Sequence, residues 1–143
     1  MTLKSLAAFT LVETTVSLAI SAVVVAGVVS GFVQSARQAE VSGYVLAAQG
    51  LASQGLEQVR AAKWDPGASP PVDQIASTNF PQLVQPLDVP GTGRTLSYAT
   101  NTTTILTIAT NPALKMIRVD CVWRFLNGRL MTNSMFTYRA PDQ

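Results

Sequence analysis

The hydrophobic and polar positions follow three different patterns along the chain. Residues 14–36 carry no charge and are mostly Val, Ala, Leu, Ile and Gly. Over residues 41–59 apolar side chains recur every three or four positions, which is the spacing of one helix face. Over residues 115–126 apolar and polar side chains alternate, which is the period of a strand. The pattern therefore predicts an apolar helix, then an amphipathic helix, then β-structure.

The apolar stretch is long enough to cross a membrane. It contains 23 residues, and about 20 apolar residues in a helix span a hydrocarbon core of roughly 30 Å. A secretory signal peptide with Lys4 at its positive end is the alternative, but the stretch exceeds the roughly 7–15 residues of a signal core and no small-x-small cleavage site follows it. Glu13 lies within the same apolar zone, where a carboxylate costs about 2.5–3.5 kcal/mol on insertion scales. A plain anchor or signal peptide has no use for it.

The two helical patterns join into one helix, which we expect from Phe9 to Lys63. Its membrane half covers residues 9–33. Its amphipathic half, residues 34–64, turns an apolar stripe toward a core. Gly27 and Gly31 have the small-xxx-small spacing of closely packed membrane helices, although glycine is also simply common in such helices.

A long loop is expected after the helix. Trp64-Asp65-Pro66-Gly67 ends the helix, because proline cannot continue it and glycine permits a turn. Six of the eight prolines lie in residues 66–90, so residues 65–93 are predicted as a loop with one short turn near residues 72–75. A loop of this length either contacts a partner or merely covers the sheet.

Residues 94–143 are predicted to form an antiparallel β-sheet of three or four strands. Asn127-Gly128 indicates a hairpin with a two-residue type I′ turn, a register that places Phe125 opposite Leu130 and Trp123 opposite Thr132. The same register places Val119 opposite Phe136 and Ile117 opposite Tyr138, so that these apolar side chains share one face. Upstream, residues 95–99 and 103–109 are expected to pair around a turn at Thr100-Asn101. The predicted fold is α+β, a long N-terminal helix packed on a small antiparallel sheet.

Composition removes most catalytic chemistry. The chain has no His and a single cysteine, Cys121, so Ser-His and Cys-His nucleophile pairs and Cys/His zinc sites are excluded. We expect Cys121 to be a small buried hydrophobic residue rather than a redox centre. Asp65, Asp73 and Asp88 fit no calcium-loop spacing and are interpreted as solvated. We therefore expect no enzyme activity, no cofactor and no metal site.

Two further features concern macromolecular partners and modification. The charge of +2 comes from ten scattered basic residues and eight acidic ones, without the basic stripe of a nucleic-acid-binding surface. Asn101-Thr102-Thr103 fits a glycosylation sequon, which is frequent by chance in a threonine-rich stretch.

The N-terminus combines a short segment that contains a lysine, Lys4-Ser5-Leu6-Ala7-Ala8, with Phe9-Thr10-Leu11-Val12-Glu13 and about twenty apolar residues after it. The first segment resembles the prepilin leader, and the second the first mature residues, of type IV pilins and type II secretion pseudopilins. The resemblance implies cleavage between Ala8 and Phe9 by prepilin peptidase and methylation of the new Phe9 amine. The family usually has Gly before the cut. Since Ala8 is the mildest replacement, slower rather than absent processing is expected.

The resemblance also implies a function in assembly. The chain would be a structural subunit of a type IV pilus or secretion pseudopilus, with an inner-membrane helix and a periplasmic head. Its partners would be prepilin peptidase, other pilin or pseudopilin subunits and the inner-membrane assembly platform. In a low-dielectric helix core Glu13 would pair with the Phe9 amine and fix the register between subunits. The alternative for Glu13 is a position at the membrane edge without such a partner.

Two alternatives remain open from the sequence. Residues 56–60, Leu-Glu-Gln-Val-Arg, and the lack of a C-terminal cysteine pair resemble minor subunits more than major ones. The alternative to assembly is a single-pass anchored protein whose extracytoplasmic domain binds a ligand without entering filaments.

Overall fold

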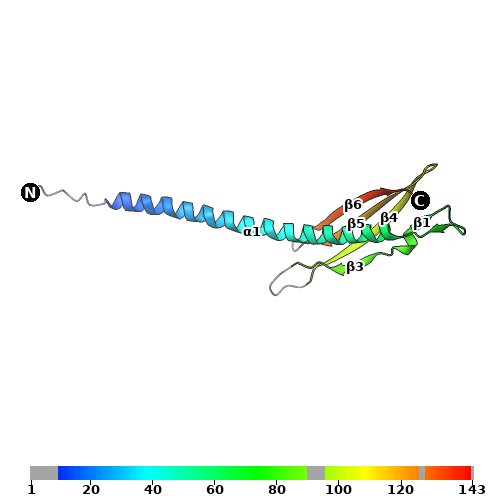
Figure 1. The fold of residues 1–143 in the computed structure, drawn as a ribbon. Coiled ribbons are helices and arrows are strands. Elements are labelled where there is room, and N and C mark those ends of the chain that lie inside the picture. The colour runs from blue at the N-terminus through cyan, green and yellow to red at the C-terminus, as the bar shows by residue number, and fades with distance from the viewer. Residues whose placement is uncertain (1–9, 90–95, 126–127, 143) are drawn as a thin grey trace, which may run out of the picture. The chain divides into compact units, whose positions relative to one another are not determined.

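The computed structural model describes residues 10–89, 96–125 and 128–142. The elements in chain order are the helix α1 (Leu11–Ala61), the strands β1 (Trp64–Asp65) and β2 (Val72–Asp73), the short 3-10 helix η1 (Ser77–Asn79), and the strands β3 (Leu83–Pro86), β4 (Tyr98–Thr110), β5 (Ala113–Arg124) and β6 (Leu130–Arg139) (Figure 1). The chain divides into two compact units, Met1–Glu40 and Val41–Gln143, and α1 contributes residues to both. The predicted α+β class and the continuous helix are confirmed.

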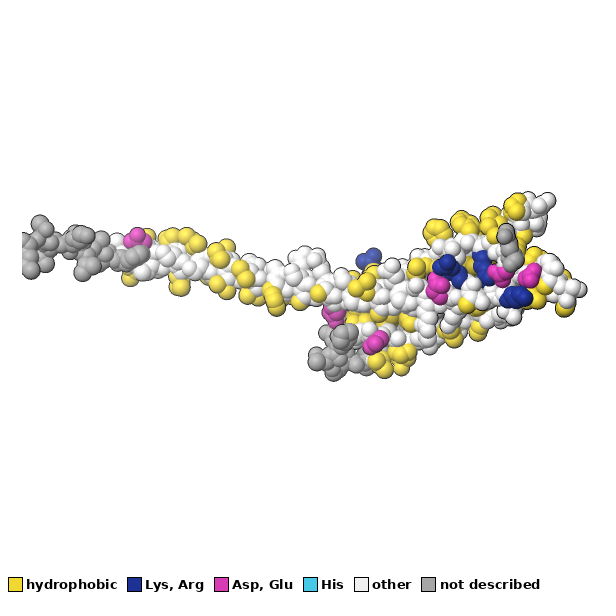
Figure 2. All heavy atoms as spheres, in the orientation of Figure 1, with side chains coloured by type: hydrophobic (Ala, Val, Ile, Leu, Met, Phe, Trp, Pro, Cys, Tyr) yellow, Lys and Arg dark blue, Asp and Glu magenta, His cyan; other side chains and the backbone are white. Residues whose placement is uncertain are grey.

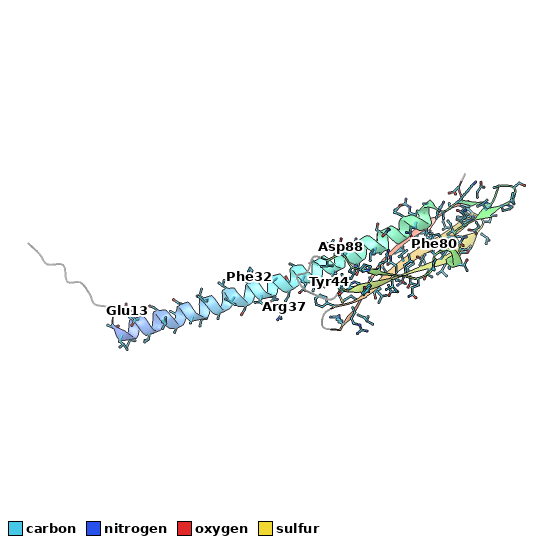
Figure 3. All side chains as sticks on the ribbon, turned by 90° about the horizontal axis from the view of Figure 1, so that it is seen from below. Glu13, Phe32, Arg37, Tyr44, Phe80 and Asp88 are labelled. Carbon is cyan, nitrogen blue, oxygen red and sulfur yellow. The ribbon has the colours of Figure 1, made fainter. Side chains whose placement is uncertain are left out.

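The second unit, which we call the head, is a four-stranded antiparallel sheet covered by the second half of α1. The strand order is β3-β4-β5-β6, so β3 and β6 are the edge strands. The helix stripe and the inward side chains of β5 form most of the core, and β1, β4 and the segments after β2 and β3 contribute one residue each. The buried members are Tyr44, Ala48, Ala52, Leu56, Val59, Trp64, Ile75, Leu87, Ala99, Ile117, Val119, Cys121 and Trp123. The Tyr44 ring stacks on the Trp123 ring at a centroid distance of 5.5 Å. Tyr44 is labelled on α1 in Figure 3.

The hairpin between β5 and β6 has a different register from the predicted one. Arg124 lies opposite Leu130 and Trp123 opposite Met131, a shift of one residue. The Phe125 N–H donates to the Arg129 carbonyl at 2.8 Å, so the connection contains three residues rather than two. Gly128 has a φ of 82°, the left-handed conformation that three-residue hairpin loops place at this position. Asn127 lies outside the described residues.

The one-residue shift reverses which face of β6 points inward, because side chains alternate along a strand. Phe136 and Tyr138, predicted to face the core, are 66% and 56% exposed, and Leu130 is exposed as well. Met131 and Met135 pack against the core instead. Asn133 also points inward, where its Oδ1 accepts from Trp123 Nε1 at 3.2 Å and its Nδ2 donates to the Val45 carbonyl at 3.3 Å. These bonds tie the edge strand to both β5 and α1.

The upstream part of the sheet also departs from the prediction. No turn forms at Thr100-Asn101, because β4 runs unbroken from Tyr98 to Thr110 and pairs with β5 along its length. The threonine-rich sequence favours this outcome, since β-branched residues suit an extended chain. Sequence reasoning missed β3, which pairs with the start of β4 from within the proline-rich segment. Pro86 is tolerated there because β3 is a short edge strand.

The segment from β1 to η1 is attached to the sheet by a buried lysine. The Lys115 ammonium donates to Asp73 Oδ1 and to the Ile75 carbonyl, both at 2.8 Å, and lies 4.8 Å from the centre of the Trp64 ring. Lys115 occupies an inward position of β5 and is only 8% exposed. The prediction that Asp73 is merely solvated is therefore wrong, because its half-exposed carboxylate neutralises a buried cation.

The C-terminal residues close the head around the end of α1. Asp142 and Trp64 exchange two hydrogen bonds, from the Asp142 N–H to the Trp64 carbonyl at 2.7 Å and from the Trp64 N–H to Asp142 Oδ2 at 2.8 Å. Arg139 donates to Asp142 Oδ1 at 2.7 Å and, through its other terminal nitrogen, to the Val59 carbonyl at 2.9 Å. The second bond satisfies a carbonyl in the last turn of the helix, where a cation is also favoured by the helix dipole.

This arrangement predicts acid sensitivity. The Trp64 backbone N–H, and after it the Arg139 guanidinium, lower the pKa of Asp142 below its ordinary value of 3.8. Because the folded-state pKa is depressed, the stabilisation is complete above pH 3.8 and is lost as the pH falls through the lower folded-state value. Asp142→Asn should therefore destabilise the head at pH 7, and its difference from the wild type should vanish in strong acid. Tryptophan fluorescence during urea unfolding measures this, because Trp64 and Trp123 both lie in the head. A difference that is equal at neutral and strongly acidic pH would contradict the assignment.

Candidate membrane-spanning and assembly segment

The helix α1 begins at a capping residue, Thr10. Its Oγ1 accepts a hydrogen bond from the Glu13 N–H at 3.3 Å, and its carbonyl accepts from the Thr14 N–H at 3.1 Å. Thr followed by Glu three residues later is the sequence of a capping box. Glu13 therefore occupies the third position of the helix, where the helix dipole favours a negative charge.

The Glu13 side chain makes no ion pair or hydrogen bond with any residue in the described part of the chain, and Figure 3 labels it in the first turn of α1. The predicted partner atom, the amine of Phe9, lies outside the described residues, as does Ala8 on the other side of the predicted cleavage point. Sequence reasoning assigned Glu13 to subunit register. Its position in the first turn gives the carboxylate a second, local role, because the helix dipole favours a negative charge there.

Beyond Glu13 the helix exposes a mostly apolar surface that carries no charge until Arg37. Every residue from Thr10 to Ala39 is exposed within the unit, including large ones such as Leu18 and Ile20. Phe32 is labelled on this part of α1 in Figure 3, and Figure 2 shows hydrophobic side chains along it. The helix is long and apolar enough to cross a membrane. An apolar surface of this extent is not stable in water, so α1 is a candidate membrane anchor.

The few polar side chains in this apolar part of the helix are satisfied locally. Ser17 Oγ donates to the Glu13 carbonyl and Ser21 Oγ to the Ser17 carbonyl, each at 2.8 Å. Thr14 and Thr15 bond back to carbonyls of the preceding turn in the same way. Such bonds remove the cost of placing a hydroxyl in hydrocarbon, so the serines and threonines do not oppose insertion.

One face of the apolar part of the helix has a shallow depression, because several of its side chains are small. Ala22, Ala26 and Ser30 line it together with Leu18, Ser21, Val25 and Val29. Gly27 and Gly31 are not among the residues that line this face, and a Cβ atom added at either would meet nothing within 4 Å. These glycines are therefore open to close approach by another helix, as the small-xxx-small interpretation requires.

Two polar residues of the head were missed as structural features by sequence reasoning. One is Lys115, described above. The other is Asn101, which is 8% exposed and donates from Nδ2 to the Leu51 carbonyl at 2.7 Å. Its sequon is therefore not accessible in the folded head. Its Oδ1 is buried and has no partner among the described residues, which costs about 1–3 kcal/mol unless something outside the chain satisfies it.

The single cysteine lies in the core as predicted. Cys121 is fully buried between the sheet and α1, and this burial raises the pKa of its thiol. Since the thiolate is the reactive form, the local environment opposes nucleophilic and redox chemistry. Within the described ranges, no group of three or more His, Cys, Asp and Glu side chains is placed to hold a metal ion.

The fold and the exposed apolar helix define a coarse class of protein, an α+β head carried on a candidate membrane anchor. Comparison of the chain with protein-family models, with curated proteins and with solved structures finds no match.

Proposed function

We propose that this chain is a structural subunit of a type IV pilus or a type II secretion pseudopilus. It is made as a precursor, cleaved between Ala8 and Phe9 by prepilin peptidase, stored in the inner membrane through its apolar helix with the head in the periplasm, and assembled with other pilin or pseudopilin subunits. The observation that carries the proposal is the start of α1. There the Glu13 carboxylate, which has no partner among the described residues, lies at the N-terminal end of an apolar surface of membrane length.

The surroundings of that carboxylate change when the subunit leaves the membrane and enters a filament. When such helices pack together, an unpaired Glu13 is expensive in their low-dielectric core and strongly favours a nearby cation. Cleavage creates one, the amine of Phe9. Its pairing with Glu13 of a neighbouring copy would fix the axial register of the subunits.

Two features of the chain favour a minor subunit over the major one. Residues 56–60 resemble minor subunits, and a C-terminal cysteine pair is missing. A minor subunit caps or primes a filament and is therefore present in few copies.

The second candidate function is a single-pass anchored binding protein that never enters a filament. A polar cleft in the head, between the second half of α1, the residues around η1 and strands β3 and β4, favours it. The two functions differ in what they require of the N-terminus, since a tether needs neither Glu13 nor a free amine at Phe9.

Processing provides the first test. Mass spectrometry of the mature protein from its native host should find a chain that begins at Phe9 and is heavier by one methyl group at the amine. The Ala8→Gly variant, which restores the residue usual in the resembling family, should be cleaved at the same bond at least as fast. A mature chain that begins beyond Ala22 would instead show that an ordinary signal peptidase had removed the apolar segment, which would refute the proposal.

A further inference from the structure

The head contains a cleft with an uncharged, amide-rich lining. It encloses about 70 Å³ between the second half of α1, the residues around η1, and strands β3 and β4. Its lining residues are Leu51, Gln54, Gly55, Gln58, Asn79, Phe80, Pro81, Leu83, Gln85, Asn101 and Thr103. None of these side chains carries a charge, five of them end in a carboxamide, and Phe80 (labelled in Figure 3) adds an aromatic ring.

An unsatisfied acceptor belongs to this lining. Asn101 is more than nine-tenths buried, and its Oδ1 has no hydrogen-bond partner among the described residues. The orientation of the amide is fixed, because Nδ2 donates to the Leu51 carbonyl at 2.7 Å and reversing the group would place two oxygens together. Gly55 permits this approach, since an added Cβ would lie 3.6 Å from Asn101 Nδ2 and only 3.2 Å from Val119.

The outer part of the cleft offers further unused hydrogen-bonding groups. Gln54 and Gln58 lie one turn apart on α1, and Gln85 reaches the cleft from β3. Among the described residues none of these three side chains makes a hydrogen bond. Each carboxamide both donates and accepts, so the accessible part of the cleft presents several donors and acceptors, whereas Asn101 Oδ1 itself is shielded from solvent.

We propose that this cleft binds an uncharged saccharide unit, whose hydroxyls pair with the carboxamides of Gln54, Gln58 and Gln85. A charged ligand is disfavoured because no lining side chain would neutralise it. A sugar ring carries several hydroxyls, which match several carboxamides at once, and C–H groups that suit Phe80, Leu51 and Leu83. A water-sized group needs about 10–15 Å³, so the cleft takes roughly five such groups, enough for one edge of a ring inserted between α1 and β3. The inference does not depend on filament assembly.

The test uses the full chain in micelles of an amine-oxide detergent, because a glucoside detergent would compete for the cleft. The probes are the methyl pyranosides of glucose, galactose and mannose, together with N-acetylglucosamine, and binding is measured by saturation-transfer NMR. At least one probe should bind to the wild type. The double variant Gln54→Ala/Gln58→Ala should weaken that binding by about tenfold to thirtyfold, the loss expected for two hydrogen bonds.

A matched control uses two other exposed glutamines of the same helix. Gln38→Ala/Gln49→Ala changes the same chemical groups outside the cleft and should leave binding unchanged. Both variants keep the fold, because Ala is the stronger helix former and all four side chains are exposed.

Three results would overturn the proposal. They are no binding of any pyranoside to the wild type at tens of millimolar, equal weakening by both double variants, and binding of acetamide as strongly as of the sugars. The last result would show that the cleft takes a single amide group rather than a sugar ring. Because processing at Phe9 is unaffected by the cleft variants, failure here is distinguishable from failure of the filament proposal.

Discussion

Replacing Glu13 with Gln is expected to lower incorporation into filaments roughly thirtyfold to more than a hundredfold. The substitution removes the charge that attracts the Phe9 amine, and a coupling of about 2–3 kcal/mol per subunit corresponds to a loss of that size. Membrane insertion should be unchanged or slightly easier, since a carboxylate in the apolar zone is costly. The measurement is the amount of each protein in sheared filaments at matched membrane levels.

The capping geometry decides which controls are needed. Thr10 Oγ1 caps the backbone N–H of residue 13, so Glu13→Gln keeps this cap while removing the charge. Thr10→Ala does the reverse, because it removes the cap observed on the Glu13 N–H and keeps the carboxylate. If Thr10→Ala reproduces the loss, the effect of Glu13 lies in helix initiation rather than in pairing.

A second control tests whether the loss of assembly is specific to Glu13 or follows from the removal of any carboxylate. Glu57 is exposed on the head and pairs with Arg60 at 2.8 Å, and Glu57→Gln should assemble normally. Equal recovery of Glu13→Gln and the wild type would defeat the register argument. It would favour the anchored binding protein.

The elements that the sequence predicted well are those with a strong and unique pattern. The helix is continuous because residues 14–36 are apolar throughout and residues 41–59 keep the helical period, and it ends at Ala61, close to the expected position. The inward face of β5 was also predicted correctly. Its inward side chains Ile117, Val119, Cys121 and Trp123 are all buried. The prediction is unambiguous there because the alternate positions on the other face of the strand are mostly polar or charged.

The register of β6 failed for the opposite reason. Both of its faces are partly apolar, with Met131 and Met135 on one and Phe136 and Tyr138 on the other, so alternation does not choose between them. Asn-Gly favours a two-residue turn locally. The three-residue connection instead brings Asn133 between Trp123 and α1, where its amide makes two hydrogen bonds. Contacts of this kind join residues far apart in the sequence, which a local pattern does not contain.

The same limitation applies to the polar residues of the head. The alternation along β5 places Lys115 on the inward face. Its partner Asp73 lies in a segment whose apolar residues follow neither the helical nor the strand period, so the sequence does not predict the pair. Asn101 stands in a stretch of threonines and was read as a chance sequon or a turn. Its amide instead packs against the helix, where Nδ2 donates to the Leu51 carbonyl, a contact between residues 50 positions apart in the sequence.

The head should lose about 3–5 kcal/mol of unfolding free energy when Trp123 is replaced by Ala. Trp123 is 1% exposed, its ring stacks on Tyr44 and its indole N–H donates to Asn133, so the substitution leaves a cavity and an unpaired amide oxygen. Urea unfolding followed by the fluorescence of Trp64 measures the change, because that residue remains in the variant.

Phe136→Ala tests the register itself. In the predicted register this ring lies in the core, and its loss would cost as much as that of Trp123. In the observed register it is 66% exposed, and its main neighbour is Tyr138, with ring centroids 6.4 Å apart. The expected cost is therefore below about 1.5 kcal/mol. Met135→Ala should cost more, because this side chain packs against the core. If Phe136→Ala is instead the more destabilising of the two, the predicted register with a two-residue turn is correct, and the Asn133 side chain faces the solvent rather than the core.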